Sequence, residues 1–95
     1  MKCERLEFSG HAVRQMFQRR ISKEDVIAVI ERAQVIAEYP DDKPFPSVLM
    51  LGFAGGRPIH LVVAKDPQSG MCIVVTAYSP NPRLWTDDFR ERRRR

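Results

Sequence analysis

The chain has 95 residues and a formal net charge of +4, with 43% hydrophobic and 29% charged residues. This composition is typical of an ordinary globular protein and excludes disordered and collagen-like classes. No apolar run approaches the roughly 18 residues that a membrane span needs. We expect one small domain that buries roughly 65% of its unfolded surface, which is a thin core. The first ten residues carry charges where a signal peptide is apolar, so we expect a cytoplasmic protein without one.

The positive charge is concentrated at the C-terminal end. Residues 90–95 hold five arginines and one glutamate, which is the whole net charge, so the rest of the chain is neutral. Such an end binds RNA, DNA or an acidic partner without sequence preference, or it only keeps the protein soluble. We interpret residues 1–90 as one α+β domain and residues 91–95 as an Arg-rich tail that is disordered without a partner.

Two helices are expected near the N-terminus. The first spans about residues 11–20, with Ser9 as its N-cap and apolar residues at helical spacing. The second spans about residues 23–33, because Ser22 followed three residues later by Asp25 resembles a capping box. Its buried stripe is expected to consist of Val26, Ile27, Val29 and Ile30.

A meander of about four antiparallel strands is expected to follow, at residues 35–39, 48–53, 57–64 and 71–78. Three prolines in residues 40–47 predict a stiff extended loop. The segment Ala54-Gly55-Gly56 suits a three-residue hairpin connection. After the break at residues 79–82, a short amphipathic arm, helical or extended, carries Trp85 and Phe89 one helical turn apart.

The hairpin determines which strand residues share a face. If Phe53 pairs with Arg57, then Met50 faces His60, because side chains alternate along a strand. The face that receives the helices then holds Leu49, Leu51, Phe53, Ile59, Leu61 and Val63. The opposite face holds Val48, Met50, Pro58, His60, Val62 and Ala64. This second face is too apolar for solvent, which indicates a binding surface, a dimer interface or a cover by the C-terminal segment.

His60 interrupts an apolar strand and is the first candidate for chemistry. Histidine titrates near neutral pH, so His60 is a candidate general base or acid. The structural alternative is a half-buried histidine that hydrogen-bonds to a neighbouring strand or loop. Arg57 at the entrance of the same strand and Lys65 at its exit are candidates for binding a phosphate. Tyr78 either adds a phenol at the same sheet edge or packs at the edge of the core.

The first helix carries a second group of candidates. His11, Arg14 and Gln18 form a polar stripe, which is either a solvated face or part of a site. Arg14, Arg19 and Arg20 form the only basic cluster outside the tail. The predicted register places His60 on the sheet face away from the helices. The two groups therefore share a site only if this helix lies over a sheet edge.

No cofactor or metal site is expected. Cys3 and Cys72 lie far apart in the sequence, and with the two histidines they lack the paired spacing of the usual zinc patterns. We interpret both cysteines as reduced and structural. The chain also lacks a glycine-rich phosphate loop, a GxSxG elbow and an HExxH motif, which leaves most familiar enzyme classes unsupported.

Several segments together are typical of one family. They are FSGHAVRQM at residues 8–16, RRIS at 19–22, EYPDD at 38–42, LG at 51–52, GRPIHLVV at 56–63 and TAY at 76–78 with the following Pro80. They span roughly residues 8–90 and resemble an uncharacterised bacterial family, domain of unknown function 4258. By its order of helix, helix and meander this family is similar to the RelE-like and BrnT-like toxin nucleases of bacterial toxin and antitoxin pairs.

The resemblance implies two N-terminal helices packed on one face of an antiparallel sheet. It also implies metal-independent RNA cleavage, in which a ribose 2′-hydroxyl attacks the adjacent phosphate. The implied base or acid is His60, the implied phosphate ligands are Arg57, Arg14 and Lys65, and Tyr78 is an auxiliary donor, with His11 as a further candidate. We expect an endoribonuclease controlled by an antitoxin-like protein. The alternative is a non-catalytic interaction module, a homodimer through the apolar sheet face.

Overall fold

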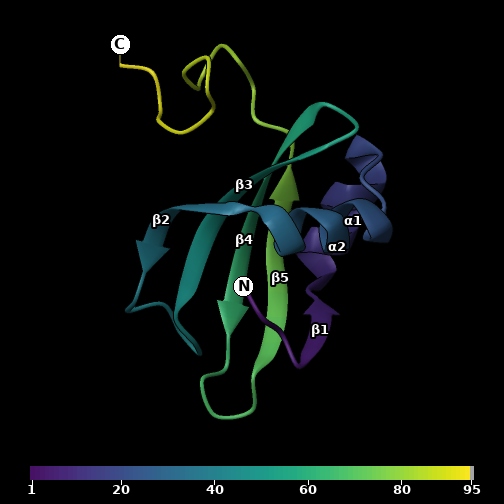
Figure 1. The fold of residues 1–95 in the computed structure, drawn as a ribbon, viewed down its shortest axis with the longest axis vertical. Helices are drawn as coiled ribbons and strands as arrows, with labels where there is room; N and C mark the ends of the chain where they lie inside the picture. Colours follow the sequence, from purple (N-terminus) through teal and green to yellow (C-terminus); the bar gives the residue numbers. More distant parts are fainter. Residues whose placement is uncertain (95) are drawn as a thin grey trace.

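The computed structural model describes residues 1–94 as an α+β fold with two helices and one five-stranded sheet (Figure 1). The elements are β1 (Arg5–Phe8), α1 (Gly10–Arg19), α2 (Lys23–Arg32), β2 (Gln34–Tyr39), β3 (Ser47–Ala54), β4 (Arg57–Lys65) and β5 (Met71–Tyr78). The strand order is β1-β5-β4-β3-β2, in which only the β1–β5 pair is parallel. The sheet is therefore mixed, and it has one strand more than the predicted antiparallel meander. No helix within residues 1–94 is both long and apolar enough to cross a membrane.

The additional strand is β1, whose four residues carry no sequence pattern strong enough to predict it. Its parallel pairing places Leu6 beside Cys72. Cys3, just before β1, thereby comes within 5.5 Å of Cys72 between Cα atoms, and the two cysteines form a disulfide. The prediction of two reduced cysteines is wrong. It depended on a separation of 69 residues along the chain, which the β1–β5 pairing closes.

The first helix begins and ends on specific backbone hydrogen bonds. Ser9 caps α1 as predicted, and its hydroxyl accepts a hydrogen bond from the N–H of Ala12. The helix terminates at Arg20, which has a left-handed backbone (φ 55°). The N–H of Ile21 donates to the carbonyl of Met16, which is the pattern of a Schellman cap. A non-glycine residue thus occupies a position that favours glycine.

The second helix packs closely on the sheet. Ser22 and Asp25 form the predicted capping box. Three of the four predicted core residues of α2 are buried, whereas Ile27 is 39% exposed. Gly52 of β3 lies beneath this helix, and a Cβ atom there would meet the side chain of Val29 at 2.6 Å. The absence of a side chain at Gly52 therefore allows the close approach of α2 to β3.

The turn between β3 and β4 is one residue shorter than predicted. Gly55 and Gly56 both have positive φ (58° and 80°), and Ala54 pairs with Arg57. Two glycines in this conformation match the twist of a tight hairpin. The predicted pairing of Phe53 with Arg57 is wrong by one residue, so the predicted faces of β3 are exchanged. The alternation along β4 is as predicted.

The sheet has two buried faces. The helix-side face forms the core with α1 and α2, and its buried strand residues are Met50, Ile59, Leu61, Val63, Cys72, Val74 and Ala77. The opposite face contains His60 and its neighbour Leu51 on β3. Leu49 and Ala64 share this second face by alternation, and all four of these residues are buried. The second face is therefore covered within one chain.

The cover includes the segment after β5, residues 79–94, which we call the C-terminal arm (Figure 1). Trp85 forms an isolated β-bridge with Arg92, and the N–H of Arg93 donates to the carbonyl of Leu84. The arm is a folded series of turns, not a helix, so Trp85 and Phe89 do not lie on one helical face. The expectation of a disordered tail is wrong where residues 91–93 make these bonds. Arg95 lies outside the described residues.

Candidate active site beneath the C-terminal arm

His60 is completely buried, and both of its ring nitrogens have hydrogen-bond partners. Nε2 lies 2.8 Å from the carbonyl oxygen of Phe89, and Nδ1 lies 3.1 Å from the hydroxyl oxygen of Tyr78. A carbonyl oxygen only accepts, so we assign the proton to Nε2. The unprotonated Nδ1 then accepts the hydrogen of the Tyr78 hydroxyl. The result is a directed chain from Tyr78 through His60 to Phe89.

Burial sets the protonation of both side chains. Desolvation of the imidazolium lowers the pKa of His60 below its usual 6.5, while the Phe89 carbonyl partly offsets this effect. Burial also raises the pKa of Tyr78 above its usual 10.0; Tyr39 raises it further, and the charge of Arg92 opposes the rise. At neutral pH the pair therefore consists of a neutral imidazole with an available lone pair and a phenol that keeps its proton.

The C-terminal arm builds the outer wall of this site. The Trp85 ring packs edge-on against His60, with 4.4 Å between the ring centroids. The guanidinium of Arg92 lies 5.5 Å from the centre of the Trp85 ring. Neither Trp85 nor Arg92 is predicted from the sequence as a site residue. An unbroken run of arginines contains no signal that distinguishes one member, and only the bridge between Trp85 and Arg92 brings this one to the site.

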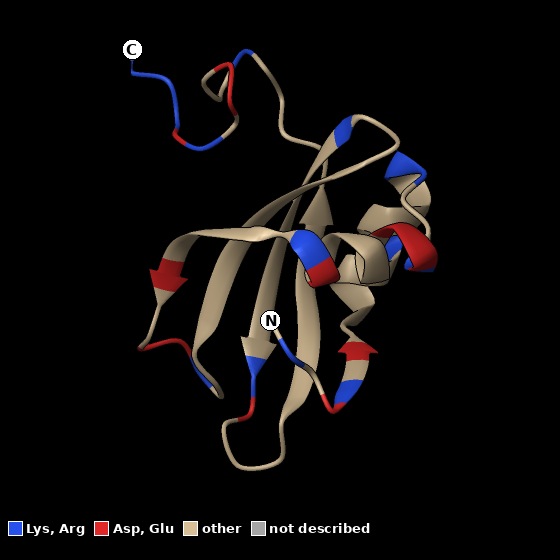
Figure 2. Cartoon of the chain, in the orientation of Figure 1, with Lys and Arg blue, Asp and Glu red and all other residues tan. Residues whose placement is uncertain are grey.

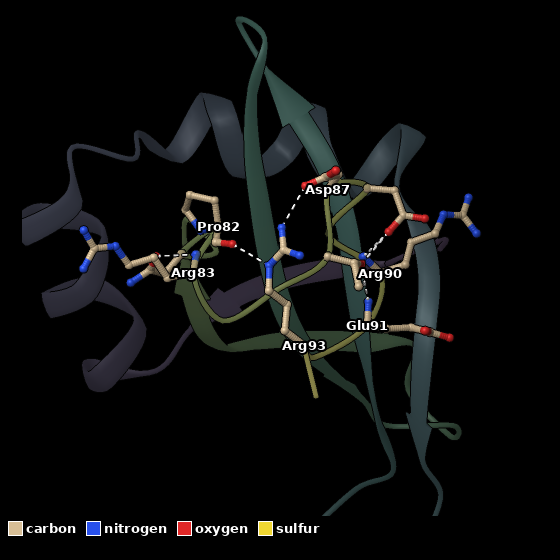
Figure 3. A network of polar contacts seen from close by, with 9 residues as sticks. Pro82, Arg83, Asp87, Arg90, Glu91 and Arg93 are labelled. Atoms are coloured by element: carbon tan, nitrogen blue, oxygen red, sulfur yellow. Dashed lines mark hydrogen bonds and ion pairs between the residues drawn. The ribbon is translucent and has the colours of Figure 1, made fainter. Parts of the chain in front are cut away.

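Polar contacts hold the arm in its folded form (Figure 3). Arg93 donates from Nη2 to Asp87 at 2.7 Å and from Nε to the carbonyl of Pro82 at 2.9 Å. Arg90 donates to the side chain of Gln34 at the start of β2. These contacts are exposed, and hydrogen bonds and ion pairs of this kind contribute about 0–1 kcal/mol each. The arm is therefore fastened at several points, each of them weak.

Two of the predicted phosphate ligands have structural roles elsewhere. Arg57 projects to the helix side of the sheet, where it donates to the carbonyls of Arg19 and Arg20 at 3.0 and 2.9 Å. It thus completes the C-terminus of α1 with a favourable charge. Lys65 lies at the other end of β4 and donates to the carbonyl of Lys2 at 2.7 Å. Neither residue is among the hydrogen-bond partners of His60.

The first helix does lie over a sheet edge. After β1 ends, α1 continues along the free edge of β5: the N–H of Ser9 donates to Val74, and the Ala77 N–H donates to the side chain of Gln15. Ala77 is the neighbour of Tyr78 in the chain, so α1 flanks the strand end that carries the phenol. His11 and Arg14 are exposed on this helix, and the hydrogen bonds of His60 go to neither of them.

Residues 1–94 hold no metal-binding cluster, and an open groove among them lies away from His60. Within residues 1–94, no three His, Cys, Asp or Glu side chains come together in a way that would hold a metal ion. An open groove of about 450 Å³ lies at the far end of the sheet, lined by residues that include Met1, Val48 and Lys65. None of the residues that contact His60 lines it. The chemistry-bearing residues and this groove are therefore separate.

The chain belongs to the family described as a domain of unknown function (DUF4258), whose model matches residues 8–79. No curated protein and no solved structure gives a significant match to it. The matched region contains both His60 and Tyr78 but ends before Trp85, Phe89 and Arg92. His60 and Tyr78 thus lie inside the region that the family model matches, whereas the residues of the C-terminal arm that cover them lie outside it.

Proposed function

We propose that this chain is a toxin-like, metal-independent RNA endonuclease, controlled by a protein partner, in which Tyr78 and His60 transfer protons. The observation that carries the proposal is the hydrogen bond between the Tyr78 hydroxyl and the unprotonated Nδ1 of a buried, neutral His60. The α+β order of two helices followed by a meander, which is similar to that of the RelE-like and BrnT-like toxins, supports the same class. A bacterial origin is part of this proposal.

The buried position of His60 assigns it an indirect role. No substrate atom reaches a side chain with 0% exposure, whereas Tyr78 is partly exposed and bonded to it. As the 2′-hydroxyl of a ribose gives its proton to the Tyr78 oxygen, the Tyr78 proton passes to Nδ1. The resulting imidazolium keeps a partner on each side, because the Phe89 carbonyl already accepts from Nε2.

The remaining steps balance without a further reactant. The 2′ oxygen forms a bond to phosphorus, the bond from phosphorus to the 5′ oxygen breaks, and the proton returns through Tyr78 to the 5′ oxygen. The products are a 2′,3′-cyclic phosphate and a 5′-hydroxyl. We assign to Arg92, whose positive charge lowers the pKa of Tyr78, the role of stabilising the negative charge of the pentavalent phosphorus.

The alternative, a homodimer through the apolar sheet face without catalysis, has less support. Leu49, Leu51 and His60 on that face are already buried in a single chain. A second copy is therefore not needed to cover them. Phe53, which is 56% exposed, is the main apolar side chain that this face leaves to solvent.

The test is RNA cleavage in excess chelator. Tyr78→Phe keeps the ring and removes only the hydroxyl, so we expect cleavage to fall about 100-fold or more. Thr76→Val is the matched control, because it removes a hydroxyl from the same strand, β5, that has no hydrogen bond to His60. Gel analysis should also detect cyclic phosphate ends. Equal cleavage by wild type and Tyr78→Phe, or no cleavage by either, would overturn the proposal.

A further inference from the structure

The outer face of α1 exposes an aromatic ring that the fold does not use. Phe17 is 88% exposed, the highest value among the large apolar side chains of residues 1–94. Val13, one turn earlier on the same helix, is 52% exposed. The helix buries Ala12 and Met16 on its opposite side. A phenyl ring this exposed contributes little to the stability of the core and is free to contact a ligand outside the chain.

The surroundings of Phe17 are positively charged. Residues 8–22 include Arg14, Arg19 and Arg20 and no acidic residue, and Figure 2 shows basic but no acidic residues on α1. Helical spacing places Arg14 three residues before Phe17, on the same exposed arc with Gln18 and His11. The ion pairs of residues 1–94 use Arg5 and Arg93 only, so Arg14 has none. This face combines one free ring, unpaired positive charge and amide or imidazole donors.

We propose that the outer face of α1 binds single-stranded RNA, with Phe17 stacking on a base and Arg14 contacting a phosphate. The inference rests on the proposed function, since it takes RNA as the substrate of Tyr78. Stacking on an exposed ring beside arginines is the usual way in which proteins hold unpaired bases. Gln15 of the same helix is hydrogen-bonded to Ala77, the chain neighbour of Tyr78, so α1 lies beside the strand end that carries the proposed catalytic tyrosine.

A protein partner fits this face less well. A stable protein interface buries about 1,200–2,000 Å² in total and needs a contiguous apolar centre. On this helix only Val13 and Phe17 are large, apolar and exposed, and they are flanked by Arg14 and Gln18. One ring is enough to stack a base, whereas two side chains are too few to anchor a partner helix.

The test is the affinity for a short fluorescent single-stranded RNA with 2′-O-methyl riboses, which cannot be cleaved, measured by anisotropy. Phe17→Ala and Phe17→Leu should each weaken binding about tenfold, because both remove the ring. Arg14→Gln should weaken binding and reduce the magnitude of the log–log salt slope by about 0.7. Phe53→Leu and Arg32→Gln, which alter an exposed ring and an exposed arginine on other elements, should bind like wild type. None of these side chains is buried, so all five variants should fold.

The outcomes separate this inference from the proposed function. If Phe17→Leu binds like wild type, the ring does not stack and the inference is wrong. A wild-type chain that fails to bind the oligonucleotide also overturns it and leaves the face to a protein partner. If the Phe17 variants lose affinity while Tyr78→Phe still cleaves natural RNA like wild type, the RNA-binding face stands and the catalytic proposal fails. If cleavage depends on Tyr78 but binding is unaffected by Phe17, the reverse holds.

Discussion

The two faces of β4 are both buried, but by different means. On the helix side Ile59, Leu61 and Val63 pack against apolar residues of α1 and α2. On the other side His60 is buried by Trp85 and Phe89 of the C-terminal arm, through ring packing and a hydrogen bond to a backbone carbonyl. The first cover consists of two capped helices. The second, the C-terminal arm, is a series of turns held by exposed hydrogen bonds and ion pairs. We infer that the free energy needed to open the C-terminal arm is lower than the free energy needed to unfold the core.

That difference matters for the proposed chemistry. While the C-terminal arm is closed, the completely buried His60 acts only through Tyr78. The arm also supplies Arg92. Opening and closing the C-terminal arm would therefore change both the access of substrate to His60 and Tyr78 and the charge near them. If the two faces are separate units of stability, a change in the helix-side core should destabilise the whole chain, whereas a change in the C-terminal arm should act locally.

The largest effect is expected on the helix side. Leu61→Ala leaves a cavity at a residue with 0% exposure, which should lower the free energy of unfolding by about 2–5 kcal/mol. Chemical denaturation measures this loss. Hydrogen exchange should show reduced protection on both faces, because the whole sheet depends on this core. A loss below about 1 kcal/mol would mean that Leu61 is not part of a tightly packed core.

On the other side, Trp85→Ala should act locally. Removal of a buried indole should lower the free energy of opening the arm by about 3 kcal/mol, as large-to-small changes generally do. The Arg93 amide, which donates to Leu84, should lose exchange protection, whereas the Leu61 amide should keep it. Leu84→Ala, at an exposed neighbour, is the control. Equal loss at both amides would show that the arm and the core form one unit.

Acidification should also lower the stability of the folded chain, in which the C-terminal arm covers His60. The pKa of His60 is lowered in the folded state, so below its usual 6.5 the unfolded chain binds more protons than the folded chain. Stability is therefore complete above about pH 6.5 and falls as the pH drops through the lowered pKa, by at most about 1.4 kcal/mol per pH unit. His60→Gln should flatten this dependence, and His11→Gln should not. An unchanged profile in His60→Gln would assign the acid sensitivity to other groups.

The smallest effect is expected at the end of α1. Arg20 has φ 55°, which costs a non-glycine residue about 1–2 kcal/mol. Glycine relieves this strain but gains about 0.5–1 kcal/mol of unfolded-state freedom. Arg20→Gly should therefore stabilise the chain by up to about 1.5 kcal/mol, while Arg19→Gly, within the helix, should destabilise it. Thermal denaturation of the two variants compares them directly, and stabilisation by neither would contradict the strained cap.

The sequence predicted the elements whose signals are local. Ser9 and the Ser22–Asp25 capping box are short-range patterns, and the structure confirms both. The predicted hairpin register is wrong by one residue. Gly55-Gly56 forms a two-residue turn, but the same sequence also suits the three-residue connection Ala54-Gly55-Gly56. The β1 strand and the disulfide were missed because they depend on contact with β5, far away in the sequence. Short-range patterns such as helix caps are therefore predictable from the sequence, whereas the pairing of segments that lie far apart along the chain is not.

The candidate site shows the same limit. His60 was predicted from its interruption of an apolar strand, and Tyr78 from its place at a strand end; the structure brings these two together. Arg57 was grouped with them because it is close in sequence, but three positions along a strand place it on the other face. Trp85 and Arg92 come from a segment without regular periodicity. Their contribution arises from the path of the arm alone.

The parallel pairing of β1 with β5 also has a consequence for synthesis. The first strand cannot complete its ladder until the last strand has left the ribosome, because Leu6 is paired with Cys72. Until then α1 lacks the strand edge that Gln15 later holds, and the apolar residues of both helices lack much of their cover. Domains that depend on such distant contacts fold slowly and expose apolar surface meanwhile. The nascent chain therefore exposes apolar surface of both helices until β5 has emerged and paired with β1.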